Sequence, residues 1–188
     1  MNWEEAKTEL QKKLDPAHVM PPPKGKYGSY IMGWHAIAEA NRIFGEDGWS
    51  YSLQSVSLTN ATQNGDMHHI GYMAIVAVTV DGTTRTDVGH GQGHGRSEGD
   101  AHGSAVKEAV TDGLKRALRT YGNPFGLALY DKSQANVGRE TPPEIIEAAK
   151  GAADIEALQT VWTANREFQH DPEFLKAKDT RKKELEAA

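Results

Sequence analysis

The clearest pattern along the chain is an alternation of apolar and other residues over residues 70–80. Ile, Tyr, Ala and three Val residues occupy every second position, as in a strand with one buried face. An Asp-Gly pair follows and favours a tight hairpin turn into a further strand over residues 83–88. A second alternating run, with one shift of register, covers residues 49–58, and a polar turn is expected over residues 60–66. These patterns predict three antiparallel strands.

A long helix is predicted after the strands. Between residues 105 and 121, apolar residues recur at every third or fourth position, as on one face of a helix, and residues 122–124 (Gly-Asn-Pro) end it. The opposite face carries Lys115, Arg116 and Arg119 within one arc of ~100°. Three strands followed by this helix predict an α+β fold. Its antiparallel β-β-β-α core would have the helix packed across one face of the sheet.

A shorter helix is predicted before the strands, and Gly45 can close it because glycine tolerates the left-handed cap. One of its faces is formed by Trp34, Ile37, Ala38, Asn41 and Phe44. We interpret this face as core packing.

Glycine alternates with His and Gln over residues 89–95, a stretch with no GxxxxGK[ST] pattern and no GxGxxG before a helix. It is therefore not a phosphate loop. Because imidazole binds transition metals, one alternative is a metal-dependent hydrolase that uses His90, His94 and Asp87. The simpler interpretation is a flexible loop, without metal, that leads to the long helix and has Ser97 or Asp100 near the helix cap.

Positive charge is concentrated around the long helix, although the chain has a formal net charge of −5. Residues 101–140 contain six Lys or Arg against four Asp or Glu, which is a net charge of +2. Like charges on adjacent turns repel, and too few carboxylates are expected nearby to neutralise them, so an external anion is a reasonable partner. The alternative is a solvated face on which Asp112 pairs with Arg116.

The chain has no cysteine, which excludes disulfides, thiolate metal sites and thiol nucleophiles. No apolar run reaches the ~18 residues of a membrane span. The first residues are too acidic for a signal peptide. We therefore expect a soluble intracellular protein.

The last third of the chain is predicted to be an appendage. Residues 134–140 are polar and form an expected linker, so we predict domains over residues 1–135 and 136–188. Thr141 is a candidate helix cap with Glu144 at the capping-box position. The helical hairpin expected here has an apolar stripe that packs on the core or binds a protein partner: Leu158, Val161, Trp162, Asn165 and Phe168.

Residues 109–123, AVTDGLKRALRTYGN, together with LYDK at 129–132, resemble the signature helix of the Rad-fifty-two family of single-strand annealing proteins. Residues 33–49 and 87–91 also fit, in the family's order and at similar separations. The resemblance covers about residues 14–135. It implies binding of single-stranded DNA and annealing of complementary strands in recombination and repair. It also implies no enzyme activity, no ATP or other cofactor, and a homo-oligomeric ring or helical assembly.

The resemblance also implies particular DNA-binding residues. Lys115, Arg116 and Arg119 would bind phosphates between the helix and the sheet, and Tyr30 matches a family tyrosine beside the inner DNA path. A family arginine in the preceding proline-rich stretch is absent, and the candidate replacements are Lys24 and Lys26.

The long tail of the larger eukaryotic family members is missing. This implies a phage or bacterial origin and a cytoplasmic location. A third possible function is a double-stranded RNA-binding module, because sheet-plus-helix modules of this size also bind duplex RNA.

Overall fold

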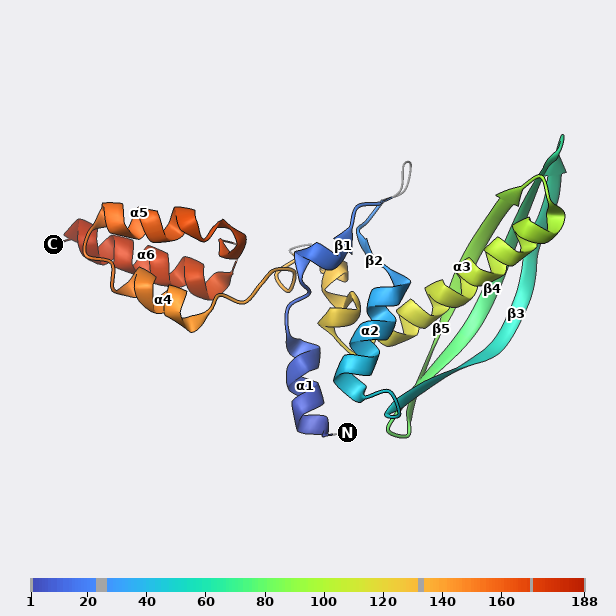
Figure 1. The fold of residues 1–188 in the computed structure, drawn as a ribbon, viewed down its shortest axis with the longest axis horizontal. Helices are drawn as coiled ribbons and strands as arrows, with labels where there is room; N and C mark the ends of the chain where they lie inside the picture. The colour runs from blue at the N-terminus through green and yellow to red at the C-terminus, as the bar shows by residue number, and fades with distance from the viewer. Residues whose placement is uncertain (1, 23–26, 132–133, 170, 188) are drawn as a thin grey trace.

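The computed structural model describes residues 2–22, 27–131, 134–169 and 171–187. It contains a three-stranded antiparallel sheet of β3 (Trp49–Asn64), β4 (Met67–Val80) and β5 (Thr83–Gly95), in the order β3-β4-β5. Helix α3 (Glu98–Arg119) crosses one face of this sheet (Figure 1). The predicted α+β fold with a β-β-β-α core is therefore confirmed.

The alternation along β4 places its apolar residues against α3. Val76, Val78 and Val80 are fully buried on this face. In β3 the register shifts twice, between Leu53 and Ser55 and between Leu58 and Asn60, which accounts for the shift expected from the sequence. The predicted polar turn over residues 60–66 was too long, because β3 continues to Asn64 and only two residues connect it to β4.

The glycine-rich stretch is the second half of β5 rather than a flexible loop. Alternate glycines face α3 at backbone contact distance. A Cβ atom added to Gly89 or Gly91 would lie 2.1 Å from the carbonyl oxygen of Ala109 or Ala105, respectively. At Gly93 it would lie 1.8 Å from the Ala101 carbonyl oxygen. The alternation of glycine is thus a strand pattern whose inner face consists of backbone alone.

Helix α3 begins earlier than the apolar recurrence indicated. The side chain of Ser97 caps it by accepting a hydrogen bond from the Asp100 amide at 3.3 Å, as the sequence suggested for this region. The first turns carry alanines that are fully buried against the glycines of β5. A helix that packs on backbone needs small residues rather than large apolar ones, so its first half lacked the expected pattern.

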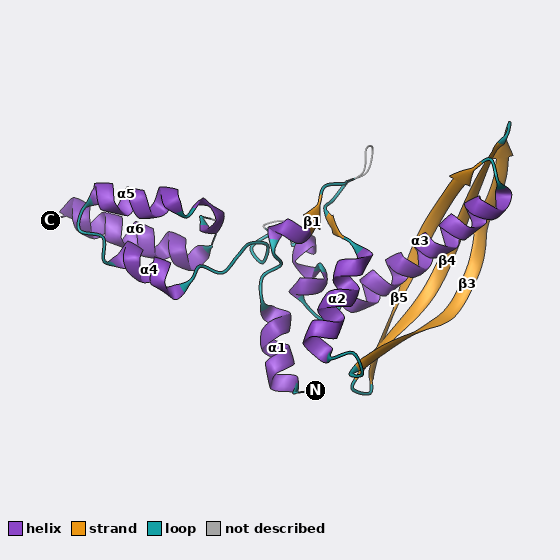
Figure 2. Ribbon diagram, viewed as in Figure 1, coloured by secondary structure: helices purple, strands orange, loops and turns teal. Residues whose placement is uncertain are grey.

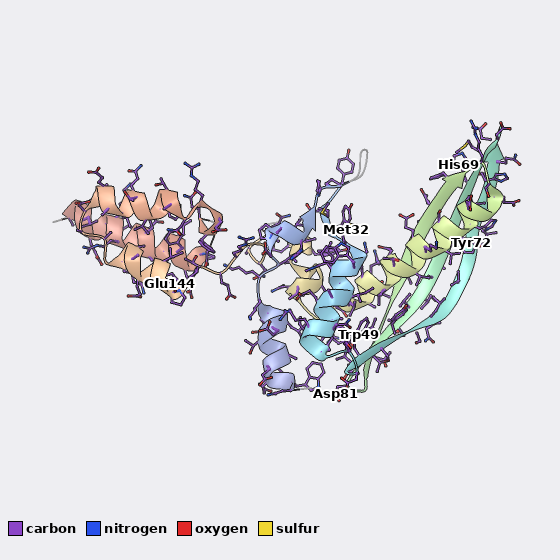
Figure 3. The ribbon with its side chains drawn as sticks, in the orientation of Figure 1. Met32, Trp49, His69, Tyr72, Asp81 and Glu144 are labelled. Carbon is purple, nitrogen blue, oxygen red and sulfur yellow. The ribbon has the colours of Figure 1, made fainter. Side chains whose placement is uncertain are left out.

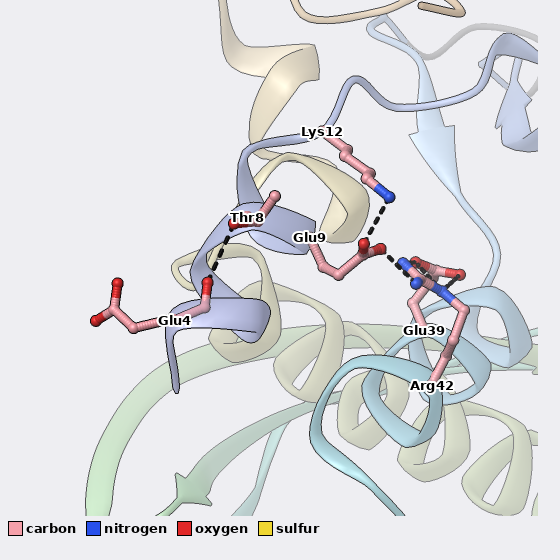
Figure 4. Close-up of polar contacts among 6 residues, drawn as sticks. All are labelled: Glu4, Thr8, Glu9, Lys12, Glu39 and Arg42. Atoms are coloured by element: carbon pink, nitrogen blue, oxygen red, sulfur yellow. Dashed lines mark hydrogen bonds and ion pairs between the residues drawn. The ribbon is translucent and has the colours of Figure 1, made fainter. Parts of the chain in front are cut away.

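Helices α1 (Trp3–Gln11) and α2 (Gly33–Phe44) pack beside the end of α3, and short strands β1 (Val19–Met20) and β2 (Tyr30–Ile31) pair with each other. Arg42 joins the two helices by ion pairs with Glu9 at 2.5 Å and Glu39 at 2.8 Å (Figure 4). The hydrogen bonds with Glu39, and then those with Glu9, raise the pKa of Arg42. The guanidinium therefore stays charged at this contact.

The core face of α2 differs from the predicted one. Trp34 is 61% exposed, and Ile37 and Ala38 are also exposed. The core is instead contacted by Ala36, Ala40, Ile43 and Phe44. Of the predicted face only Phe44 is buried, and Asn41 is half-buried, where it accepts a hydrogen bond from Nε1 of Trp49 at 2.8 Å.

The C-terminal part is a three-helix bundle of α4 (Pro143–Lys150), α5 (Ile155–Ala164) and α6 (Pro172–Ala187). It thus has one helix more than the predicted hairpin. Its apolar stripe packs inside the bundle around Phe174 and Leu158, in a core separate from that of the sheet. The bundle lies at the far end of the molecule from the sheet (Figure 2). No helix in the described ranges is long and apolar enough to cross a membrane.

The link between the two parts is held by side-chain and backbone contacts. Thr141 does not cap a helix as predicted, because its amide and hydroxyl both donate to Asp171 at 2.7 Å. Asp171 also forms an ion pair with Lys13 at 2.8 Å. Leu14 and Val137 form a parallel β-bridge. The predicted linker is therefore attached to the N-terminal part along much of its length.

Candidate nucleic-acid interface

A groove lies between the last turns of α3, strand β2 and the two short 3-10 helices that follow α3, Asn123–Phe125 and Leu127–Tyr130. The charged and aromatic side chains that line it are Tyr30, Asp112, Lys115, Arg116, Arg119, Phe125 and Tyr130. The structure thus brings together the three predicted cations and the predicted tyrosine, although Tyr30 is far from them in sequence. Lys24 and Lys26 lie outside the described residues.

Lys115 faces Tyr30 across this groove. Its ammonium nitrogen lies 5.5 Å from the centroid of the Tyr30 ring and 3.4 Å from the Ile31 carbonyl oxygen. A cation over a ring face is attracted by the ring's quadrupole. Among the described residues, Lys115 forms no ion pair with a carboxylate, so its charge is available to an external anion.

Arg119 and Tyr130 form the second cation–aromatic pair. The guanidinium carbon of Arg119 lies 4.0 Å from the centroid of the Tyr130 ring, and Nη1 donates to the phenolic oxygen. Tyr130 is 63% exposed and gives the groove a flat aromatic wall. Sequence reasoning did not select Tyr130 as a site residue, although the LYDK motif contains it.

The arginines are not free of carboxylates, contrary to the expectation from the sequence. Asp87 on β5 lies 3.2 Å from Nε of Arg116 and 3.6 Å from Nη2 of Arg119. Burial would lower the pKa of Arg116, but the hydrogen bond and charge of Asp87 outweigh burial and raise it. The Asp112–Arg116 ion pair of the alternative interpretation is not formed among the described residues, and Asp112 instead accepts from the His90 amide at 3.2 Å. Asp87 therefore orients the two guanidinium groups toward the groove.

The residues of the alternative metal site are not brought together. The register of β5 is regular, so Asp87 points to the α3 side while His90 and His94 point to the other face of the sheet. His94 instead contacts His69, with 2.8 Å between their Nδ1 atoms. Within the described ranges, no group of three His, Asp or Glu residues has the geometry to hold a metal ion.

Residues 2–144 match the family described as Rad52/22 family double-strand break repair protein. The chain is 42% identical over 135 residues to DNA repair and recombination protein RAD52 of Kluyveromyces lactis, covering 69% of this chain and 30% of that protein. It is 40% identical over 141 residues to DNA repair and recombination protein rad22 of Schizosaccharomyces pombe, covering 71% and 30%. It is also 42% identical over 135 residues to DNA repair and recombination protein RAD52 of Saccharomyces cerevisiae, covering 69% of this chain and 28% of that protein.

The matched region spans about 30% of the length of these relatives and ends near the start of the three-helix bundle. The relatives come from yeasts, so they give no support to the phage or bacterial origin expected from the sequence. The match includes the sheet, α3 and every described groove residue. The chain belongs to the Rad52/Rad22 family of DNA repair and recombination proteins.

Proposed function

We propose that this protein binds single-stranded DNA in the groove and anneals complementary strands during recombination and repair. The observation that carries the proposal is the convergence of Lys115, Arg116 and Arg119 on one groove with tyrosines on its walls. Phosphate contacts position a strand without reading its sequence, and aromatic rings accept any base. Both properties suit annealing, which must act on strands of any sequence.

The roles of the side chains follow from their contacts. Among the described groove cations, Lys115 is the one without a carboxylate partner. It can therefore bind a phosphate without losing an existing ion pair. Arg116 and Arg119 are held by Asp87 and can direct their remaining donors to neighbouring phosphates. Tyr130 and Tyr30 limit where bases and sugars lie. The backbone is then fixed while the pairing edges of the bases stay accessible.

The proposed reaction makes and breaks no covalent bond, so the protein acts without enzyme activity, ATP or another cofactor. A single groove contains three cations and the carboxylate of Asp112, with Asp87 beside them, and is a weak anion site. Useful affinity therefore requires several grooves along one strand, because linked sites gain avidity from effective concentration. We propose a homo-oligomer that aligns these grooves.

The test is a fluorescence annealing assay with complementary oligonucleotides, without nucleotide and with EDTA. The parent protein is expected to accelerate pairing under these conditions. The triple variant Lys115→Ala, Arg116→Ala, Arg119→Ala should lose most single-strand binding, and its salt slope should fall by about 0.7 for each phosphate contact removed. The control is Lys176→Ala, Lys182→Ala, Lys183→Ala, which makes the same charge change in the three-helix bundle.

Three results would contradict the proposal. Equal loss of binding in the two triple variants would show that net charge matters and the groove does not. Activity that EDTA abolishes would support the metal-dependent alternative. A preference for duplex RNA over single-stranded DNA would support the RNA-binding alternative.

A further inference from the structure

A pair of histidines lies at the end of the sheet far from α1 and α2, where Figure 3 labels His69. His69 on β4 and His94 on β5 are directly opposite each other in the strand register, on the face of the sheet that points away from α3. Their Nδ1 atoms lie 2.8 Å apart, and their ring centroids lie 4.9 Å apart with 64° between the ring planes. Since a neutral imidazole has one donor and one acceptor nitrogen, one Nδ1 donates to the other.

The surroundings leave this pair accessible. His94 is exposed and His69 is half-buried. Gly93 and Gly95 flank His94, so no adjacent side chain on β5 crowds its ring. Neither imidazole is paired with a carboxylate among the described residues. A ligand from solvent can therefore reach both rings without breaking an ion pair.

The spacing of the two Nδ1 atoms fits a metal ion that both of them bind. Two nitrogens at adjacent corners of a square-planar site, each ~2.0 Å from the metal, lie ~2.8 Å apart. Tetrahedral geometry with the same bond lengths needs ~3.3 Å. Imidazole suits copper, and Cu²⁺ combines a square-planar preference with the highest affinity among the divalent first-row ions. We propose that His69 and His94 form a surface site for Cu²⁺, with water in the remaining positions.

Binding requires only a local rearrangement. The proton on the donating Nδ1 moves through solvent to Nε2 of the same ring, so both imidazoles bind as neutral ligands. Histidine has a broad torsional preference about Cβ–Cγ, so both rings can rotate until their lone pairs point to one centre. The ion would connect β4 to β5 where the sheet ends, and should stabilise the folded chain. This site differs from the metal-dependent alternative, because it uses two histidines and not Asp87, and takes no part in strand annealing.

Among the described histidines, no other pair offers two converging nitrogens. The rings of His18 and His35 stack face to face, with centroids 4.1 Å apart and 18° between the planes. His90 lies four residues along β5 from the pair, which is ~13 Å and too far to share an ion. His102 on α3 has Nε2 at 3.9 Å from a carboxylate oxygen of Glu98. That arrangement supplies one imidazole only, and carboxylates suit Mg²⁺, Ca²⁺ and Mn²⁺ better than Cu²⁺.

Calorimetric titration with CuSO₄ tests the proposal, using the full chain without an affinity tag. The parent should bind one Cu²⁺ per chain at its tightest site. His69→Gln and His94→Gln each leave one imidazole and should weaken this binding by about 10–100-fold, because two linked ligands gain affinity from effective concentration. The controls are His68→Gln, the adjacent residue on the other face of β4, and His102→Gln, and both should bind Cu²⁺ like the parent.

Two further measurements give readouts beside affinity. The electron paramagnetic resonance spectrum of the parent with one equivalent of Cu²⁺ should show a tetragonal ion with hyperfine coupling to two nitrogens, which needs no variant. Cu²⁺ should raise the midpoint of thermal unfolding of the parent and both controls, but not of His69→Gln or His94→Gln, because a ligand stabilises only the state that binds it. Zn²⁺ should bind more weakly than Cu²⁺.

Three outcomes would overturn the inference. The first is equal Cu²⁺ affinity of the parent, His69→Gln and His94→Gln, which would leave the pair as a hydrogen bond only. The second is a spectrum of the parent without two nitrogen ligands. The third is a loss in His102→Gln as large as that in His94→Gln, which would assign the ion to α3. None of these outcomes bears on annealing, which the groove variants test separately.

Discussion

The sheet–α3 contact and the three-helix bundle build their cores in opposite ways. In the first, glycines of β5 meet the backbone of α3 so closely that an added Cβ atom would lie about 2 Å from main-chain oxygens. In the second, large side chains fill the space between helices, such as Trp162 and Phe174 with ring centroids 5.0 Å apart. One interface is fixed by backbone contact and the other by interlocking side chains.

The difference shows what each part can tolerate. Side chains can shift rotamers when a neighbour changes, whereas two backbones in contact have no such freedom. The close contact fixes α3 relative to β5, and therefore fixes Arg116 and Arg119 relative to Asp87. The positions of the cations in the groove thus depend on glycines of β5, which have no side chain.

The largest expected effect comes from a methyl group inserted at this contact. Gly91→Ala should destabilise the chain by more than about 3 kcal/mol, because the new Cβ atom meets backbone atoms of Ala105 and Ala109 that cannot move independently. Gly95→Ala on the same strand should be tolerated, since its nearest neighbour would lie at 3.6 Å. Urea unfolding followed by circular dichroism measures both. Equal stability of the two variants would contradict the backbone contact.

Phe174→Ala should affect the bundle alone. Removal of this fully buried ring should destabilise the bundle by about 3–5 kcal/mol, while binding of single-stranded DNA stays at the parent level. Hydrogen exchange should rise over residues 143–187 and remain slow over residues 67–119. A chain that ends at Gly138 should likewise fold and bind, which tests the predicted domain boundary. Loss of DNA affinity in either protein would place part of the site in the bundle.

Acid should weaken the attachment of the bundle through Asp171. Burial raises the pKa of this carboxyl, but hydrogen bonds from Lys13 and Thr141 outweigh burial and lower the pKa to about 2. The resulting stability, about 2 kcal/mol, is present above the ordinary pKa of 3.8 and is lost as the pH falls from about 4 through 2. Unfolding measured from pH 6 to pH 2 should show a smaller acid loss in Asp171→Asn. An identical loss in both proteins would exclude this contact as the cause.

The smallest expected effect is that of a single lysine substitution, made once in the groove and once in the three-helix bundle. Lys115→Ala should weaken binding of single-stranded DNA and reduce the salt slope by about 0.7, because one phosphate contact is removed. Lys183→Ala, an exposed lysine on α6, should change neither quantity measurably. Fluorescence anisotropy at several salt concentrations measures the slopes. Equal slopes for the two variants would mean that Lys115 contacts no phosphate.

The sequence predicted correctly those elements whose own side chains show the spacing of buried positions. The alternating valines of β4 identify a strand in any context, because period-two burial needs no information from elsewhere. The apolar recurrence before residue 121 likewise predicted α3 and the placement of Lys115, Arg116 and Arg119 on one face. Helix geometry alone fixes which residues share a face.

Tertiary structure decided whatever depended on a partner distant in the chain. The glycines of β5 lack a side chain to report burial, so only the approach of α3 shows that they form a strand. The apolar face of Trp34 and Ile37 looks like a core face, and only the packing of α1 and α3 beside α2 shows that it remains uncovered. Asp87 and Tyr130 contact Arg119 from other elements, and no local pattern encodes these contacts. A sequence gives the preferences of each segment, whereas burial and pairing are properties of two segments in contact.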